Sequence, residues 1–231
     1  METLFELEHG KSIVRYSCPA EAEGLIATLD EIAASLGWKP EGQIGEYRGN
    51  SEYFGVLVNG RLAGGLQLVV ANGRDPLPVG RVWPEINLSL RTDVAHAAIM
   101  ALRQEYRGMP GLFGALTVEM WRHCALHGIA EIWMEATPET HRLYTRMGWP
   151  LEAAGPSRLH WGEACAIYRM STAGVAGNVV IRALRSEAQR STLSSMVRMA
   201  PSAASVANMP AKCDTMAYEA RSEAAIPAGA A

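Results

Sequence analysis

The chain has 231 residues, of which 48% are hydrophobic and 19% are charged, enough apolar material for one large domain or for one domain with a tail. Its 21 Lys and Arg against 24 Asp and Glu give a net charge of −3, so no excess of positive charge predicts binding to nucleic acid. Its apolar runs are too short for a transmembrane segment, its first residues lack the apolar core of a secretory signal, and its four scattered cysteines form no Cys-x-x-Cys pair, so we expect a cytoplasmic protein without a zinc knuckle or disulfide scaffold.

The first third of the chain predicts a strand, a helix and a hairpin. A short strand is expected over 12–17, and apolar residues at helical spacing predict a helix over 18–38. A polar stretch follows. Asn59-Gly60 then lies between two apolar runs within 53–71, which is a strong signal for a hairpin with a primed turn.

The middle of the chain predicts one strand and one helix before the glycine-rich segment. Residues 82–90, VWPEINLSL, are typical of a strand with a proline near its start. Residues 93–106, DVAHAAIMALRQEY, favour a helix capped by Thr92 or Asp93.

The remaining elements predict a helix over 115–127, a largely apolar strand over 129–136 and a short helix over 138–148. Two closing strands are expected within 158–162 and 165–171. This order indicates an α/β layered domain whose centre is a mixed sheet, with one pair of parallel strands joined by a helix.

The composition changes near residue 172. The segment 172–231 is rich in Ala and Ser and has one aromatic residue, so it lacks the apolar mass that offsets the entropy of ordering. We therefore predict a domain over 1–171 and a largely disordered tail over 172–231, with one possible helix at 179–199.

A glycine-rich loop precedes the helix predicted at 115–127. Glycine lets the backbone approach a ligand closely, and the free N–H groups at a helix start favour an anion. The loop is therefore a candidate phosphate-binding site, although a plain structural turn is the alternative. The candidate binding residues are Arg107, Gly108, Gly111, Leu112, Phe113, Gly114 and Ala115.

The order of elements, the loop-helix segment and HRLYTRMGWPLE together resemble the GNAT superfamily of acyltransferases over about 12–171. Within it, the sequence is most similar to the autoinducer (acyl-homoserine-lactone) synthases and long-chain N-acyl amino acid synthases. Three features carry this likeness. PEINLSL looks like the Glu-Leu-Ser-Arg-Phe strand, the segment 93–106 looks like an insertion, and the residues from Met147 to Met170 look like the closing segment of these synthases.

The resemblance implies an N-acyltransferase that moves an acyl group, in this subgroup a fatty acyl group, from acyl-CoA or acyl carrier protein to the amine of a small, amino-acid-like acceptor. It implies no tightly bound cofactor, and acyl carrier protein is a possible partner. Glu85 matches the motif glutamate and is the candidate base, with a salt bridge to Arg81 or Arg91 as the alternative. Tyr144 matches the general-acid tyrosine of many GNAT enzymes, with packing on the sheet as the alternative.

Other interpretations stay open. The acceptor could be acetylated from acetyl-CoA instead, or the domain could sense an acyl thioester without catalysis. Glu119, His123 and His127 recur on one helix face, where two histidines could bind zinc or the face could simply be exposed to water. A long acyl chain would need an apolar slot, and the residues that could line it or form ordinary core are Met120, Trp121, Trp133, Met134 and Met147.

Overall fold

The structure is a computed structural model that describes residues 1–7, 9–38, 43–109 and 111–175. Its centre is a nine-stranded sheet. Eight of the strands follow the order β1-β2-β3-β4-β5-β6-β9-β7, and the ninth, β8, pairs with β9. Neighbouring strands are antiparallel except for β5 and β6, which are parallel and joined by a helix. The strands are β1 (Glu2–Leu7), β2 (Lys11–Tyr16), β3 (Ser51–Val58), β4 (Arg61–Val70), β5 (Val94–Leu102), β6 (Glu131–Ala136), β7 (Glu152–Ala153), β8 (Arg158–His160) and β9 (Glu163–Ser171).

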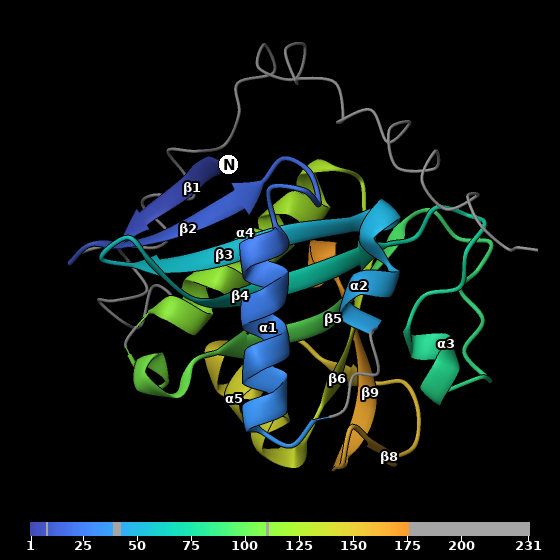
Figure 1. The fold of residues 1–231 in the computed structure, drawn as a ribbon. Coiled ribbons are helices and arrows are strands. Elements are labelled where there is room, and N and C mark those ends of the chain that lie inside the picture. Colours follow the sequence, from blue (N-terminus) through green and yellow to red (C-terminus); the bar gives the residue numbers. More distant parts are fainter. Residues whose placement is uncertain (8, 39–42, 110, 176–231) are drawn as a thin grey trace, which may run out of the picture.

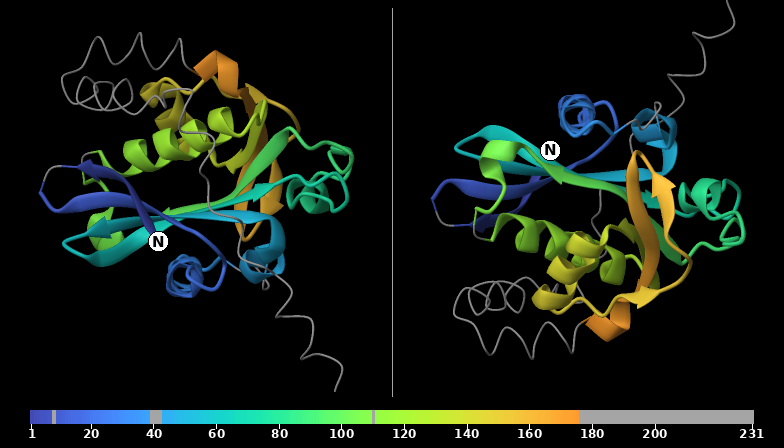
Figure 2. Two further views of the ribbon diagram at one scale, coloured as in Figure 1. Left: turned by 90° about the horizontal axis from the view of Figure 1, so that it is seen from above. Right: turned by 90° about the horizontal axis from the view of Figure 1, so that it is seen from below.

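Helices cover both faces of this sheet. Helix α1 lies on one face, and α4 and α5 lie on the other, as the edge-on views in Figure 2 show. The short helix α2 follows α1 on its side of the sheet, and α3 lies beyond the end of the strands (Figure 1). The helices are α1 (Glu23–Ser35), α2 (Gln43–Glu46), α3 (Val79–Val82), α4 (Leu112–Leu126) and α5 (Pro138–Met147), with two 3-10 turns at Arg48–Asn50 and Gln104–Tyr106.

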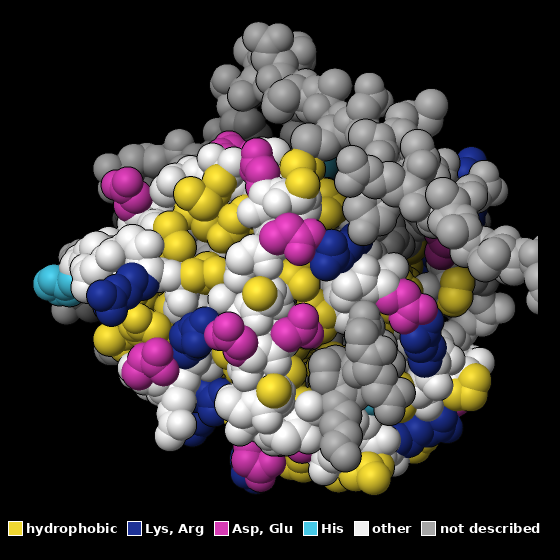
Figure 3. All heavy atoms as spheres, in the orientation of Figure 1, with side chains coloured by type: hydrophobic (Ala, Val, Ile, Leu, Met, Phe, Trp, Pro, Cys, Tyr) yellow, Lys and Arg dark blue, Asp and Glu magenta, His cyan; other side chains and the backbone are white. Residues whose placement is uncertain are grey.

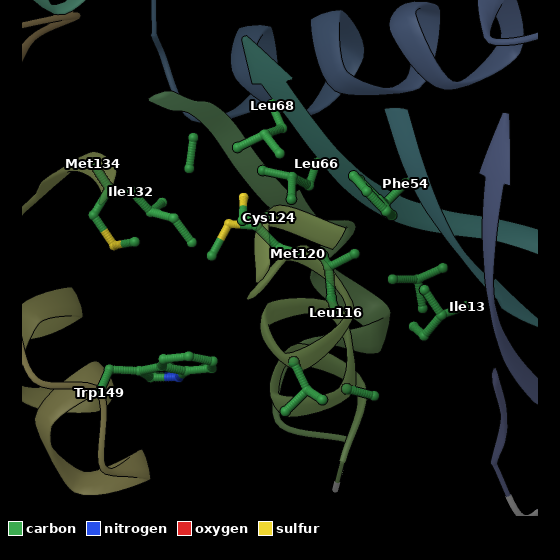
Figure 4. Packing of buried hydrophobic residues seen from close by; sticks show 14 of the residues in the cluster. Ile13, Phe54, Leu66, Leu68, Leu116, Met120, Cys124, Ile132, Met134 and Trp149 are labelled. Atoms are coloured by element: carbon green, nitrogen blue, oxygen red, sulfur yellow. The ribbon is translucent and has the colours of Figure 1, made fainter. Parts of the chain in front are cut away.

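The main apolar core lies between the sheet and α4, and Figure 4 shows side chains from several strands meeting those of the helix. Leu116, Met120 and Cys124 lie at helical spacing on one side of α4 and are buried against the sheet. A second cluster packs α1 onto the opposite face, where Ile99 and Ala101 of β5 meet the buried side of the helix. Strand β5 is therefore covered on both faces.

Several elements predicted from the sequence are confirmed, because their signals are local. Asn59 and Gly60 turn the hairpin of β3 and β4 with φ of +50° and +75°, as a primed turn requires. Thr137 caps α5 by accepting a hydrogen bond from the Thr140 N–H, and Gly148 ends that helix with φ of +96°. The predicted mixed sheet with one parallel, helix-linked pair of strands is also confirmed.

Two predicted elements are wrong. Residues 83–91 form no strand, because the chain there makes turns that follow α3, and residues 94–102 form the strand β5 rather than a helix. The four alanines of β5 raise its helix propensity, but the two packed layers on its faces override that weak preference. The likeness of PEINLSL to a synthase strand and the inserted helix at 93–106 therefore do not hold.

The predicted domain end at Ser171 is followed by a described turn of helix over 172–175. The Thr172 hydroxyl donates to the Ile129 carbonyl, and the Trp121 indole N–H donates to the Thr172 carbonyl. Val175 is fully buried in the main core. These contacts favour a domain boundary after Val175, while the tail and its possible helix at 179–199 lie outside the described residues.

The surface that carries α1 shows basic and acidic side chains among one another rather than a patch of one sign (Figure 3). Within the described part of the chain, no helix is both long and apolar enough to cross a membrane.

Candidate active site

The parallel strands β5 and β6 separate at one end and open a cleft between them. Their pairing runs from Val94–Glu131 to Ala97–Met134 and then stops, although β5 continues to Leu102 and β6 to Ala136. The pairing of β4 with β5 also skips Ala98, so β5 bends at this bulge. The resulting cleft has a volume of about 810 Å³, which is the size of a pocket for a sizeable organic ligand.

Small side chains keep this cleft open. Ala97, Ala98, Ala101 and Ala136 line it on the two strands, while larger apolar groups line it further out. The larger apolar groups are Leu36, Ile99, Met100, Leu102, Phe113, Met134 and Leu143. The cleft is thus an apolar slot with room for a flexible chain.

The side of the cleft toward α4 contains part of the predicted loop. Arg107 and Gly108 line the cleft, and the Arg107 Nε donates to the Leu102 carbonyl at 2.9 Å. This bond directs an exposed guanidinium from the end of β5, with its two Nη groups left for other partners. Gly108 and Gly111 have φ of +80° and +82°, values that glycine adopts without strain.

The remaining loop residues form the start of α4. Gly111 is its N-cap, and no side chain caps the first turn. Phe113 lines the cleft, but Leu112 and Ala115 are buried in the main core, so only their backbone N–H groups could serve a ligand. Gly114 lies in the first turn. The residues of the candidate phosphate-binding loop therefore lie close together, and Arg107, Gly108 and Phe113 line the cleft itself.

Tyr144 of α5 lines the same side of the cleft. Its ring is 5.6 Å from that of Phe113, and its hydroxyl donates to the Met100 Sδ at 3.8 Å. Burial raises the pKa of Tyr144, so its phenol stays protonated at neutral pH. A thioether is a weak acceptor, and this hydrogen-bond donor therefore remains usable by a ligand.

Glu85 lies away from the cleft. Its carboxylate accepts two bonds from the Arg158 Nη2, at 2.9 and 3.1 Å, and its side chain is 46% exposed. The predicted place near the start of a central strand was wrong, because residues 83–91 are irregular. A salt bridge was the alternative for Glu85, and its partner is Arg158 rather than Arg81 or Arg91.

The other side of the cleft, toward α1, contains a buried cluster that sequence reasoning missed. The neighbours of Glu135 on β6, Met134 and Ala136, pack in the α4 core, so strand alternation turns Glu135 to the opposite face. Its Oε2 is 2.7 Å from the His160 Nδ1, and its Oε1 is 3.5 Å from the His96 Nε2. Both Glu135 and His160 line the cleft.

His96 is the innermost member of this cluster. It is 1% exposed, and burial lowers its pKa, so the imidazole is neutral near pH 7. Neither of its ring nitrogens forms a hydrogen bond, and the same is true of the Glu135 Oε1 and the His160 Nε2. A cavity of about 10 Å³, close to the size of one water molecule, lies among His96, Glu135 and His160.

Two tryptophans complete this side. Trp38 follows α1, and Trp161 is the first residue of the two-residue turn between β8 and β9. Their rings are 5.9 Å apart, both line the cleft, and neither indole N–H has a hydrogen-bond partner. Trp161 has φ of +51°, a conformation that is costly for a bulky residue and often marks a functional site.

Sequence reasoning missed this cluster because its members come from four separate segments. His96 was assigned to a helix, Glu135 is the one acid late in an apolar strand, and His160-Trp161 was read simply as strand. A carboxylate inside the run IWMEA was the available signal, since a charge within a buried strand needs a partner.

The residues considered for a zinc site on α4 do not line the cleft. Glu119 and His123 are buried rather than facing water, and Glu119 pairs with Arg122 at 2.6 Å. The His123 and His127 rings stack at 4.0 Å. Among the described residues, no group of three or more potential ligands could hold a metal ion.

Of the residues considered for an acyl slot, Met134 lines the cleft, whereas Trp121 bonds to Thr172 and Trp133 packs near Trp83.

Solved structures share this architecture. FeeM, an N-acyl amino acid synthase from uncultured soil microbes, matches with a TM-score of 0.62 and 11% identity over 73% of this chain and 94% of its own. The CoA-dependent acyl-homoserine lactone synthase BjaI matches with a TM-score of 0.60 and 13% identity over 83% and 92%. The acyl-homoserine lactone synthase LasI matches with a TM-score of 0.53 and 15% identity over 73% and 94%.

These similarities show that the chain shares the fold of these synthases. A scan against models of known protein families finds no match, and neither does a search of curated protein sequences.

Proposed function

We propose that this protein is an N-acyltransferase that moves an acyl group from a thioester donor to the amine of a small, amino-acid-like acceptor. The observation that carries the proposal is the apolar cleft of about 810 Å³ between the diverging ends of β5 and β6. Structural neighbours of the same fold include a synthase whose crystal structure contains isopentyl-CoA and S-adenosylmethionine.

The donor would lie on the α4 side of the cleft. The backbone of β5 beyond Ala97 has no partner strand on its β6 side, so its polar groups are available to the amide-rich pantetheine arm. The first-turn N–H groups of α4 and the Arg107 guanidinium would hold phosphate. Acyl-CoA and acyl carrier protein share this arm, and both remain candidate donors.

The size and lining of the cleft favour a fatty acyl group over acetyl. An acetyl group would leave most of the apolar lining without contacts, whereas a longer chain would bury it at about 25 cal/mol per Å². Each buried CH₂ contributes about 0.8 kcal/mol, so donor affinity should rise by roughly fourfold per carbon until the slot is full.

Tyr144 would assist the departing thiolate. Its protonated hydroxyl lies within the cleft beside the sulfur of Met100, and the sulfur of the donor would replace that thioether as acceptor. The acyl carbonyl would then lie near the point where β5 and β6 separate.

The test is a matrix of acyl-CoA donors from C2 to C16 against the twenty amino acids and homoserine lactone precursors, read by mass spectrometry, with the corresponding acyl carrier proteins as a second donor series. The proposal predicts N-acylated product with a chain-length optimum above C4. An optimum at C2 would indicate an ordinary acetyltransferase. Donor binding in calorimetry without any product would indicate a sensor and would contradict the proposal.

A further inference from the structure

The unpartnered polar atoms at the cleft form two complementary groups. Glu135 Oε1 and His160 Nε2 are buried acceptor positions without a hydrogen bond, and the Trp38 and Trp161 indoles are buried donors without one. All four side chains line the α1 side of the cleft. Leaving a buried polar group unsatisfied is costly, so such a concentration indicates a place where a ligand supplies the missing partners.

The geometry of the Glu135–His160 pair sets the proton position. A carboxylate can only accept, so the His160 Nδ1 at 2.7 Å from the Glu135 Oε2 is the protonated nitrogen. The His160 Nε2 of a neutral imidazole is then left with a lone pair. The carboxylate also stabilises the imidazolium that forms when Nε2 takes up a proton, which is the arrangement that orients a catalytic histidine.

Other charged and titratable groups around this pair leave its role intact. His96 from β5 is neutral because burial lowers its pKa, so it adds no positive charge against proton uptake. Glu163 of β9 and Glu139 of α5 also line the cleft, and both are acidic and favour a cation there. Arg107 lies on the α4 side, in the loop that follows β5.

The two indoles define the rest of the ligand. The two indole N–H groups need a hydrogen-bond acceptor such as an oxygen atom. The Trp161 ring lies beside His160, with 4.7 Å between the two ring centroids. Trp161 has a φ of +51° in the two-residue turn between β8 and β9, a conformation that is costly for a bulky residue. An amine with a neighbouring carboxylate or carbonyl would satisfy both sets of groups at once.

We propose that the α1 side of the cleft is the acceptor subsite, with His160 as the general base, Glu135 as its positioning residue, and Trp38 and Trp161 as donors to an oxygen next to the acceptor's amine. This inference rests on the proposed acyl transfer and assigns its second substrate to residues of this chain. The acceptor class that fits is an α-amino acid or its ester, lactone or amide.

The reaction balances within these groups. The acceptor's ammonium gives one proton to the His160 Nε2, directly or through one bridging water, and the freed lone pair attacks the thioester carbonyl carbon. The C–N bond forms, the C–S bond breaks, and the thiolate leaves. The nitrogen's second proton passes to the thiolate with help from the Tyr144 hydroxyl, so the products are an amide and a thiol, and the proton on His160 returns to solvent.

The first experiment measures turnover and its pH dependence in His160→Gln and Glu135→Gln. Glutamine at 160 can still donate to Glu135 but cannot take up a proton, so kcat should fall by about a hundredfold or more near pH 7 while the donor KM stays within about twofold. The deficit should shrink as the pH approaches the pKa of the free amine. In Glu135→Gln, kcat should fall while the donor KM stays within about twofold, since the imidazolium that forms during the reaction loses its charged partner.

The matched control is His141→Gln, whose ring stacks on Tyr168 at 4.3 Å outside the cleft lining. This variant should keep wild-type kinetics. A His160→Gln enzyme with a kcat within threefold of wild type, or one whose deficit does not change with pH, would overturn the assignment of the base while leaving acyl transfer in place.

The second experiment needs no turnover and uses the wild-type protein. Calorimetry and tryptophan fluorescence would compare phenylalanine with phenethylamine, and leucine with isopentylamine, pairs that differ only in the carboxylate. We expect the amino acid of a pair to bind at least tenfold more tightly and to change indole fluorescence, and Trp161→Phe to reduce that preference. Equal affinity within every pair, or binding by neither member in a panel of all twenty amino acids, would overturn the subsite even if acyl transfer to another amine is observed.

Discussion

The two sides of the cleft differ in how they are built. The α4 side consists of one loop and the helix that follows it, with an exposed guanidinium and backbone N–H groups. The α1 side gathers His96, Glu135, His160 and two tryptophans from four segments into a buried cluster with unsatisfied polar atoms. The first arrangement suits a long charged ligand that extends into solvent, and the second suits a small polar ligand that is enclosed.

The largest expected effect comes from disturbing the close approach of β4 to the end of β5, from which the loop on the α4 side begins. A Cβ added at Gly64 would lie 2.2 Å from the Ala101 carbonyl oxygen and 2.8 Å from the Leu102 Cα, and Gly64 has φ of +140°. Gly64→Ala therefore combines overpacking and backbone strain, each costing about 1–3 kcal/mol. At roughly 2–4 °C per kcal/mol, Tm should fall by more than about 5 °C in a thermal melt, and the position of Arg107 at Leu102 should be lost with it.

Gly24→Ala is the matched control. Gly24 lies in the first turn of α1, and nothing lies within 4 Å of its added Cβ, so alanine should leave Tm unchanged or raise it slightly. Equal melting temperatures for the two variants would mean that β4 and β5 adjust more easily than their spacing indicates.

The next effect separates the two sides by their kinetics. Arg107→Ala should raise the donor KM by about ten- to a hundredfold, since a hydrogen bond to a charged group contributes about 1.5–3 kcal/mol. The exposed side chain should be replaced with less than about 0.5 kcal/mol of lost stability. Steady-state kinetics at saturating acceptor would measure this.

The result would be informative because His160→Gln should do the reverse and lower kcat at an unchanged donor KM. Arg107→Ala with a wild-type donor KM would show that the guanidinium serves only its bond to the Leu102 carbonyl. If the loss of affinity were the same for acyl-CoA and for acyl-pantetheine, which lacks the nucleotide phosphates, Arg107 would not bind phosphate.

The same contrast explains what the sequence could and could not predict. Arg107, Gly108 and Phe113 lie at or just before a helix start, so a local signal was enough to predict them as one group, and all three line the cleft. His96 and Glu135 meet only because β5 and β6 are parallel neighbours, and His160 joins them only through the β8–β9 hairpin. An error of one element, the helix assigned to 93–106, was enough to hide the cluster and to leave Glu85 as the apparent base.

A smaller effect tests the burial of the α1 side through pH. Burial lowers the pKa of His96 in the folded state below its unfolded value of about 6.5, so the unfolded chain binds more protons between these two values. The free energy of unfolding should therefore fall as the pH drops below about 6.5, by up to about 1.4 kcal/mol per pH unit.

Urea unfolding between pH 5 and 7.5 would measure that slope. The comparison is with His96→Gln, which should flatten the slope, and with His141→Gln, which should not. An identical slope in His96→Gln would mean that His96 takes up a proton equally readily in the folded and the unfolded chain.

The smallest effect concerns Tyr144, a buried side chain with a polar group on the α4 side of the cleft. Tyr144→Phe removes a hydroxyl whose hydrogen-bond acceptor is the Met100 thioether, so its loss should barely change stability. A hydrogen bond to the departing sulfur contributes about 0.5–1.5 kcal/mol, so kcat should fall by about two- to tenfold at an unchanged donor KM. Because burial raises the pKa of Tyr144, its phenol stays protonated through the neutral range, and the wild-type and variant pH–rate profiles should have the same shape.

Tyr168→Phe, outside the cleft lining, is the control and should keep the wild-type kcat. A Tyr144→Phe enzyme with wild-type kcat would leave this residue the packing role beside Phe113. A loss beyond a hundredfold would instead make the α4 side a source of acid catalysis comparable to the base proposed at His160, and the two sides of the cleft would then differ in architecture but not in chemical importance.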